Sequence, residues 1–256
     1  MTDPGAAESL SGWRVLVTRP REQAAPLAAV IRALGGEPVI HPTIELAPPP
    51  SWDALDAALS RLSDYAWIVF TSPSAARATC GRAEAHGARA RLGDPRIAAV
   101  GVETARALRA LGLRVDLIPD EREQRQEGLV SAFAAAGVGA GARVLFPQAV
   151  GGRELLREVL AARGCVVDVV PVSQTLPVRG GDAPPDFDAA TFASPSALRA
   201  FVESWGAARL ESAAVAVIGP TTADAARALG VRVDAMPSTP SMPALAHALA
   251  AHRRGR

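Results

Sequence analysis

The chain repeats itself, and this repeat is the feature that most constrains its fold. Residues 70–75, Phe-Thr-Ser-Pro-Ser-Ala, return as residues 192–197, Phe-Ala-Ser-Pro-Ser-Ala. Residues 99–108 return as residues 217–226, and each copy has a threonine three positions after a glycine. Each copy places a polar loop between an apolar run and an alanine-rich run typical of a helix. The duplication predicts two similar α/β domains that present hydroxyls and helix N-termini to one ligand.

Short β-branched runs alternate with Ala/Leu/Arg-rich helical patterns along nearly the whole chain. This alternation is typical of βαβ units and of a parallel sheet. Pro73 and Pro195 fit the first helical position after the two serine loops. Leu-Gly pairs at residues 34–35, 111–112 and 229–230 fit helix ends followed by glycine. The predicted strands are residues 14–18, 37–41, 67–71, 96–100, 115–118, 143–147, 166–170, 189–192, 214–218 and 232–235.

A second repeat relates the remaining strands. The run at residues 14–17 and the next strand resemble the run at residues 143–146 and the strand after it. If the two-strand segment is named AB and the three-strand segment CDE, the chain reads AB, CDE, AB, CDE. The whole chain is therefore built from two kinds of segment, each present twice.

Two domain arrangements fit this order. A tandem arrangement divides the chain near the glycine-rich residues 137–142. A nested arrangement makes residues 47–171 one domain, and residues 1–46 with 172–256 the other. A proline-rich stretch lies near each boundary of the nested arrangement, where the chain would cross between domains. The residues alone leave both arrangements open.

Composition excludes several classes of partner. The formal net charge is +1, which offers no electrostatic footprint for nucleic acid or a membrane surface. No apolar run approaches the roughly 20 residues of a membrane span. Residues 1–12 lack the apolar core of a signal peptide, so a cytoplasmic protein is expected.

Residue types and spacings that the sequence lacks exclude several kinds of catalytic and metal site. The chain has no lysine, which excludes a Schiff-base lysine and the lysine of a phosphate-binding P-loop. Its four histidines are scattered without metal-ligand spacing, so no metal site is expected. Cys80 and Cys165 match no metal or redox motif and are interpreted as buried, reduced thiols.

Four serines follow predicted strands and begin helices: Ser72, Ser74, Ser194 and Ser196. The carboxyl edge of a parallel sheet is where open α/β folds bind ligands, so these hydroxyls are candidate ligand contacts. The alternative is simple N-capping, because Ser-Pro-Ser is a favourable helix start in any protein.

Gly101 with Thr104, and Gly219 with Thr222, form the second duplicated loop. The backbone N–H groups of such a helix start favour anions. The alternative is that both glycines only permit tight turns between a strand and a helix.

Arginines occupy two further loops. Gly152 and Arg153 follow the predicted strand at 143–147, and Arg19 follows the first strand. An arginine could pair bidentately with a carboxylate, and glycine permits close approach of the backbone. The alternative for either arginine is a solvated surface charge. Taken together, these residues favour a polyanionic organic ligand, and a two-domain α/β binding protein or a cofactor-free enzyme.

The duplicated loops, the opening at residues 15–20 and the segment at residues 147–156 together resemble the uroporphyrinogen-III synthase family. The most specific piece is residues 218–223, Ile-Gly-Pro-Thr-Thr-Ala, with the proline-rich segment at residues 237–245. The resemblance runs from about residue 13 to residue 250. It implies two flavodoxin-like parallel-sheet domains, one nested in the other, joined by two crossing segments, with the substrate between them.

The resemblance also implies a reaction. Hydroxymethylbilane, a linear tetrapyrrole, loses its hydroxyl to give an azafulvene, which closes through a spiro intermediate with inversion of the last pyrrole ring. The product is uroporphyrinogen III, and no cofactor or metal is needed. A transient hand-over of substrate from the preceding pathway enzyme is also expected. By position in the matching motifs, Thr71, Gln148 and Thr221 join the candidate substrate contacts, and Thr222 becomes a candidate catalytic residue.

One segment departs from the family pattern. The family usually has a tyrosine in the second crossing, in a Val-Tyr-x-Thr context, that is thought to assist departure of the hydroxyl. Here residues 172–175 read Val-Ser-Gln-Thr, so Ser173 stands in its place, and Tyr65 is the only tyrosine in the chain. The rival interpretations are a non-catalytic tetrapyrrole-binding or regulatory module of the same fold and, more distantly, a two-domain binding protein of the periplasmic type.

Overall fold

The computed structural model describes residues 9–254, so expectations for residues 1–8 and 255–256 lie outside the described part. The chain divides into two compact units. Unit 1 comprises residues 1–46 and 176–256, and unit 2 comprises residues 47–175. The expected boundary after residue 171 lies inside strand β7 (Val166–Pro177), before the observed boundary after Thr175. Both units are built on parallel sheets, so the predicted fold class is confirmed.

The sheet of unit 1 has the strand order β2-β1-β8-β9. All of its pairings are parallel. Ala235 bridges to Ala216 of β9 and so continues the sheet by one position. Counted along this unit, the order is 2-1-3-4-5, the doubly wound order of flavodoxin-like folds. The strands are β1 (Arg14–Val17), β2 (Glu37–Ile40), β8 (Ala189–Phe192) and β9 (Ala214–Val217).

The sheet of unit 2 has the same spatial order, reached by a permuted chain. Its strands lie in the order β3-β7-β6-β4-β5, and Leu117 bridges to Ala98 of β5. The A and B strands, β6 and β7, here follow the C, D and E strands in sequence. β3 is an added edge strand beside β7, and only its last residue, Ala47, belongs to unit 2. The remaining bounds are β3 (Ile44–Ala47), β4 (Trp67–Phe70), β5 (Arg96–Ala99) and β6 (Arg143–Ala149).

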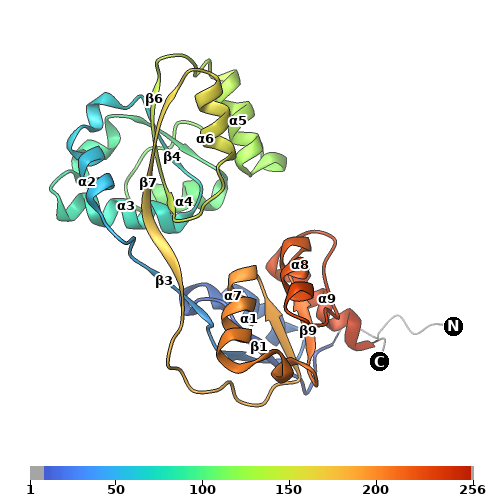
Figure 1. The fold of residues 1–256 in the computed structure, drawn as a ribbon. Coiled ribbons are helices and arrows are strands. Elements are labelled where there is room, and N and C mark those ends of the chain that lie inside the picture. Colours follow the sequence, from blue (N-terminus) through green and yellow to red (C-terminus); the bar gives the residue numbers. More distant parts are fainter. Residues whose placement is uncertain (1–8, 255–256) are drawn as a thin grey trace. The chain divides into compact units, whose positions relative to one another are not determined.

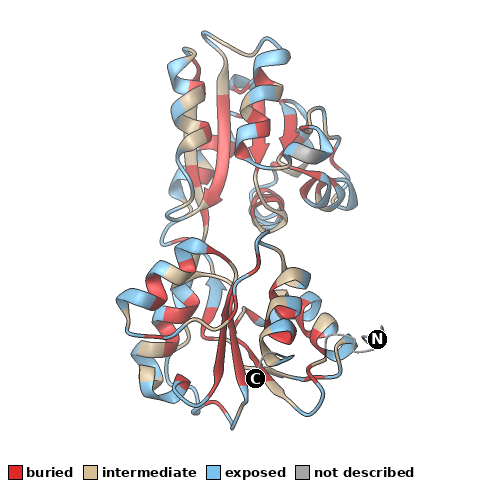
Figure 2. Ribbon diagram, turned by 90° about the vertical axis from the view of Figure 1, so that its right-hand side faces the viewer, coloured by how far each residue is buried: buried red, intermediate tan, exposed pale blue. Residues whose placement is uncertain are grey.

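Helices cover both faces of each sheet, and the central strands β4, β8 and β9 are accordingly buried along their whole length (Figure 2). In β4, Ile68 and Phe70 pack into one core, while Trp67 and Val69 pack into the other. Side chains of a strand alternate between faces, so a strand buried on both faces is apolar at every position.

The helices divide between these faces. In unit 1, α1 and α9 share one apolar cluster, and α7 and α8 share the other. In unit 2, α2, α3 and α4 share one cluster, and α5 and α6 lie together on the other face (Figure 1). The α-helices are α1 (Arg21–Ala33), α2 (Asp53–Ser60), α3 (Pro73–Ala85), α4 (Val102–Ala110), α5 (Gln126–Ala135), α6 (Leu155–Ala162), α7 (Pro195–Trp205), α8 (Pro220–Ala228) and α9 (Met242–Arg254). The 3₁₀ turns are η1 (Leu62–Asp64), η2 (Arg89–Gly93), η3 (Glu121–Glu123) and η4 (Ala207–Leu210).

Two predicted strands, residues 115–118 and 232–235, are reduced to single bridges. In each, an aspartate side chain takes a hydrogen bond that a regular ladder would give to the backbone. Asp116 Oδ2 accepts from the backbone N–H of Ile97 at 2.8 Å, and Asp234 Oδ2 accepts from that of Val215 at 2.8 Å. The predictions of full strands at these two positions are therefore wrong, for the same reason in both units.

The helix boundaries follow the predicted signals. Pro73 and Pro195 are the first residues of α3 and α7. Leu34 ends α1, and Gly35 follows it with φ +82°, a left-handed conformation that glycine adopts without strain. Gly112 and Gly230 repeat this geometry, with φ +75° and +69°.

The two segments that connect the units are hydrogen-bonded to each other. β3 pairs with β7, and the side-chain amide of Gln174 donates to the carbonyl of Pro48 at 2.9 Å. Further along, the N–H of Val178 donates to the carbonyl of Thr43 at 2.9 Å. These hydrogen bonds join the two connecting segments into a two-stranded ribbon.

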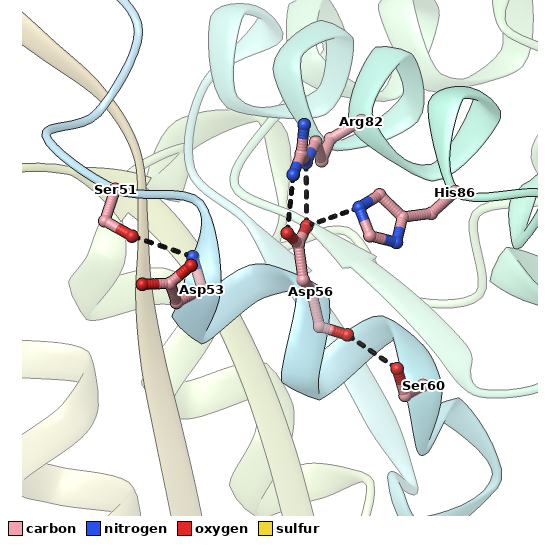
Figure 3. A network of polar contacts seen from close by, with 6 residues as sticks. All are labelled: Ser51, Asp53, Asp56, Ser60, Arg82 and His86. Atoms are coloured by element: carbon pink, nitrogen blue, oxygen red, sulfur yellow. Dashed lines mark hydrogen bonds and ion pairs between the residues drawn. The ribbon is translucent and has the colours of Figure 1, made fainter.

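An ion-pair network ties α2 to α3 (Figure 3). Asp56 accepts from Arg82 Nε at 2.7 Å and from Nη2 at 2.5 Å, and His86 Nε2 lies 3.1 Å from its Oδ1. The Arg82 guanidinium also stacks on the ring of Trp52, 5.4 Å from its centroid. The hydrogen bonds from Arg82 hold the pKa of Asp56 below its usual range.

We expect Asp56→Asn to lower the stability of the protein in a pH-dependent way. A carboxyl whose pKa is lower in the folded state stabilises the fold while it is ionised, above its unfolded value of about 3.9. That contribution is lost as the pH falls through the folded-state pKa. Urea unfolding at pH 7, 5 and 3 should give a large difference from the unmodified protein at pH 7 and 5, and a smaller one at pH 3. Asp53→Asn, an exposed change on the same helix, is the control, and a pH-independent difference would contradict the assignment.

Residues 47–175 are expected to fold when expressed alone. Two apolar clusters of the described residues lie wholly within this segment and cover both faces of its sheet. Circular dichroism during urea unfolding should show one cooperative transition. A fragment of residues 1–136 lacks β6, β7 and α6, so it should unfold without a cooperative transition. The opposite result for the two fragments would favour a tandem division.

Candidate functional site

Each sheet reverses its strand order between the A and C strands. In unit 1 this point lies between β1 and β8, and in unit 2 it lies between β6 and β4. Ligands of doubly wound folds bind outside the carboxyl ends of the strands at such a reversal. The loops that follow these four strands contain most of the candidate residues, and the second duplicated loops follow the neighbouring strands β5 and β9.

Buried threonine hydroxyls hydrogen-bond across the point in unit 1 where the strand order reverses, between β1 and β8. Thr18 Oγ1 donates to the carbonyl of Thr191 at 2.8 Å, and Thr191 Oγ1 donates to the carbonyl of Leu16 at 2.7 Å. Thr43 Oγ1 donates to the carbonyl of Ala197 at 2.9 Å, at the start of α7. These three hydroxyls join β1, β8 and α7, so the loops that follow start from a rigid base.

The serine loop of unit 1 contains a helix cap. Ser194 Oγ accepts from the N–H of Ala197 at 3.2 Å, and Ser196 Oγ lies 3.0 Å from it. Ser196 is exposed at the helix start. Capping therefore uses Ser194, while the exposed Ser196 remains a candidate contact.

The second duplicated loop of unit 1 begins α8. Gly219 is buried, Thr221 is exposed, and Thr222 is 2% exposed. Gly219 precedes α8 and has no side chain with which to cap it, and Pro220 at the first position of the helix has no N–H. The accessible hydroxyl of this loop thus belongs to Thr221, and Thr222 lies beneath it.

Arg19 lies at the carboxyl end of β1 and is half-buried. Its Nη2 donates to Gln23 Oε1 at 2.9 Å, and its Nη1 donates to Met242 Sδ at 2.8 Å. Its Nε is buried without a hydrogen-bond partner. Among residues 9–254, no carboxylate forms an ion pair with it. Burial lowers the pKa of Arg19, as expected of a cation held without a counter-ion.

The serine loop of unit 2 repeats the cap. Ser72 Oγ accepts from the N–H of Ala75 at 3.1 Å, at the start of α3. Thr71 and Ser74 are partly exposed on either side of it. The duplicated Ser-Pro-Ser loop therefore has one structural serine and one accessible serine in each unit.

The start of α4 in unit 2 is covered by a side chain of its own unit. Gln124 Oε1 accepts from the N–H of Val102 at 3.1 Å. A Cβ on Gly101 would lie only 2.7 Å from the same oxygen, so the glycine permits this approach. Thr104 is 3% exposed within the first turn. This helix start is thus less available to an external anion than the sequence suggested.

Gln148 lies near the carboxyl end of β6, and Gly152 and Arg153 lie in the loop after it. Gln148 is 7% exposed, and a Cβ on Gly152 would overlap its Oε1. Arg153 is exposed and pairs with Glu127, Nη2 to Oε1, at 2.7 Å. That bond holds the pKa of Glu127 below its usual range. The start of α6 is capped by Gln126, whose Oε1 accepts from the N–H of Leu156 at 3.3 Å.

Ser173 lies on β7 at the same edge of the sheet. It is opposite Ala149, where a bulge shifts the register between β6 and β7, and its carbonyl accepts from the N–H of Val150 at 2.8 Å. Tyr65 lies at the amino edge, where its hydroxyl donates to Asp168 Oδ2 at 2.6 Å. Burial, together with that hydrogen bond, raises the pKa of Tyr65 to about 12. Tyr65 therefore has a structural role and cannot replace a tyrosine at position 173.

Large exposed apolar side chains accompany these loops. Val102 and Val150 follow β5 and β6 in unit 2, and Met236 follows the last bridged position of unit 1. Leu46 and Leu176 lie on the connecting strands β3 and β7. Apolar side chains beside amides, hydroxyls and a cation suit an amphipathic ligand.

The structure therefore gathers the predicted residues at the carboxyl edge of each unit separately. Unit 1 brings together Arg19, Ser194, Ser196, Gly219, Thr221 and Thr222, and unit 2 brings together Thr71, Ser72, Ser74, Gly101, Thr104, Gln148, Gly152, Arg153 and Ser173. Gln124 and Gln126 were not predicted from the sequence, because no local pattern marks a glutamine that caps a helix far along the chain.

Other features have a smaller bearing on function. Cys80 and Cys165 are buried free thiols, as predicted, and burial raises the pKa of both. Within residues 9–254, no three His, Cys, Asp or Glu side chains gather as metal ligands. None of the helices in that part of the chain is long and apolar enough to cross a membrane.

Comparison with known proteins identifies the family. The family model for uroporphyrinogen-III synthase HemD matches residues 25–247. The chain belongs to the uroporphyrinogen-III synthase family. A uroporphyrinogen-III synthase of Synechococcus elongatus is 33% identical over 248 residues, which cover 90% of this chain and 91% of the relative. One from Chlorobaculum parvum is 30% identical over 247 residues, covering 92% and 97% of the two chains.

Solved structures agree on the fold. A uroporphyrinogen-III synthetase of Helicobacter pylori matches with a TM-score of 0.67 at 15% identity, over 95% of this chain and 99% of that one. A mutant uroporphyrinogen III synthase of Thermus thermophilus matches with a TM-score of 0.58 at 20% identity, over 95% and 100%. These structures confirm the expected fold, while the family model and the curated relatives confirm the family resemblance drawn from the duplicated loops.

Proposed function

We propose that the protein converts hydroxymethylbilane to uroporphyrinogen III without a cofactor, as a cyclising lyase. The C–O bond of the hydroxymethyl group breaks, and the hydroxyl leaves with a proton as water. The resulting azafulvene is attacked by the substituted carbon of the last pyrrole, and the spiro intermediate opens and recloses with that ring inverted. Membership of the uroporphyrinogen-III synthase family is the observation that carries this proposal.

The chemistry of the carboxyl edges supports it. The substrate is a flexible chain of apolar pyrroles with acetate and propionate carboxylates. The exposed Val102, Val150 and Met236 suit the rings, while Arg19 and the start of α8 suit carboxylates. Binding at these loops would restrain a chain whose unrestrained closure gives the wrong isomer. We therefore assign substrate contacts to both units.

Two hydroxyl residues are proposed to assist the departing hydroxyl. Thr222 lies in the first turn of α8, where the helix dipole stabilises developing negative charge. Ser173 lies on β7 beside the loop after β6. No strong acid–base pair is required, because positioning supplies much of the rate. A transient hand-over of the unstable substrate from the enzyme that makes it remains part of the proposal.

The proposal is tested by incubating the protein with freshly prepared hydroxymethylbilane. After oxidation, the type I and type III porphyrins are separated chromatographically. We expect the type III isomer to predominate, with or without a metal chelator, and heat-inactivated protein to give only the spontaneous type I isomer. If the active preparation also gives only type I while still binding the tetrapyrrole, the non-catalytic module is the correct alternative.

Ser173→Tyr is expected to raise turnover. If a phenol at this position assists loss of the hydroxyl, its absence lowers the rate without abolishing it, because positioning is retained. General-acid assistance is worth about 100-fold to 10,000-fold, and a partly exposed group should give at most about 100-fold. The control is Ser173→Phe, which adds the ring without the hydroxyl and should not raise kcat. Equal effects of the two variants, or no gain with tyrosine in a stably folded protein, would refute this role.

A further inference from the structure

The two units have diverged at equivalent positions around the ligand edge. When β1 is aligned with β6 so that Arg14 matches Arg143, Arg19 of unit 1 is equivalent to Gln148 of unit 2. The helix after the fifth strand begins at Gln126 in unit 2 and at Met242 in unit 1. Two residues earlier, unit 2 has Gln124 and unit 1 has Pro240. Three glutamines of unit 2 thus correspond to an arginine, a methionine and a proline of unit 1.

In unit 2, two of these glutamines accept hydrogen bonds from backbone N–H groups at helix starts, which a bound anion would otherwise accept. Gln124 caps α4 through the N–H of Val102, and Gln126 caps α6 through the N–H of Leu156. Gln148 is buried against Gly152. Arg153 is already paired with Glu127, and the exposed Arg125 acts electrostatically on the same carboxylate. The starts of α4 and α6 are therefore already capped, and the two exposed arginines of this edge, Arg125 and Arg153, share the carboxylate of Glu127.

In unit 1, the equivalent residues Pro240 and Met242 place no capping side chain on the start of α8 and no counter-ion on Arg19. Pro240 Cγ lies 3.5 Å from the place of a Cβ on Gly219, and proline has no side-chain amide that could cap the start of α8. Met242 offers Arg19 only a thioether sulfur, a weak acceptor. Gln23, the other partner of Arg19, is neutral. A half-buried guanidinium held by two neutral groups, with a buried Nε that has no partner, is electrostatically incomplete without an anion.

We propose that carboxylate recognition is concentrated in unit 1, where Arg19 binds a carboxylate of the substrate, whereas the equivalent edge of unit 2 is closed by its own glutamines and binds none. This inference rests on the proposed function for the identity of the substrate. It makes Arg19 a determinant of affinity for the carboxylated ligand. The units then have different tasks although they share one fold.

The test adds one carboxylate to each unit without changing side-chain shape. Gln23→Glu gives Arg19 a counter-ion of its own, and Gln124→Glu places the same charge at the edge of unit 2. The probe is uroporphyrin III, a stable carboxylated porphyrin, titrated by tryptophan fluorescence at low and high salt. We expect Gln23→Glu and Arg19→Gln to weaken binding by about 10-fold to 100-fold at low salt and to reduce its salt dependence. Arg19→Lys should restore part of the affinity.

Gln124→Glu should change the affinity by less than about twofold, and so should Arg227→Gln, which removes an exposed charge from the last turn of α8. Thermal unfolding of every variant identifies any loss of folding.

A loss of affinity in Gln124→Glu as large as that in Gln23→Glu, or unchanged binding by both Gln23→Glu and Arg19→Gln, would overturn the proposal. If the unmodified protein forms the type III isomer while these variants bind normally, only the division between units fails. If it forms none but the variants behave as expected, only the proposed reaction fails.

Discussion

The parallel pairing of β1 with β8 is the interaction on which the rest of the structure depends. Val15 pairs with Ala189, although the whole of unit 2 lies between them in sequence. The cost of closing so long a loop grows only slowly with its length. The pairing of β3 with β7 reduces the cost further, because it holds the two ends of the insertion together. Thr18 and Thr191 then fasten β1 to β8 at the edge from which the ligand loops depart.

Much of the fold could be predicted because its central strands, such as β4, β8 and β9, are buried on both faces. Such strands are continuous apolar runs, and the helices between them have clear proline and glycine boundaries. The prediction failed where side chains replace backbone pairing, as with Asp116 and Asp234. It also missed β3, a four-residue segment (Ile44–Ala47) enclosed by Pro42 and Pro48, which pairs only because β7 continues past its own unit. Both failures involve interactions that are specified by residues far along the chain.

The candidate site was predictable in position and less so in detail. The duplicated loops had to lie at the carboxyl edge, because a parallel sheet places every strand–helix loop there. Which hydroxyls serve as caps was not predictable: the structure assigns this to Ser72 and Ser194. The caps from Gln124 and Gln126 lie 22 and 30 residues from their partners, beyond the reach of any local pattern. These contacts also distinguish the two units, which the repeat alone makes look alike.

The permuted order of unit 2 has a consequence for the whole chain. Each half, before and after the turn at residues 137–142, holds a complete set of five strand positions in the same sequence order. In the folded protein, the first two strands of each half pair with the last three of the other half. Both connections between the units are the same link, from the second strand position to the third. The molecule therefore has the connectivity of a domain-swapped dimer whose two subunits have been fused head to tail.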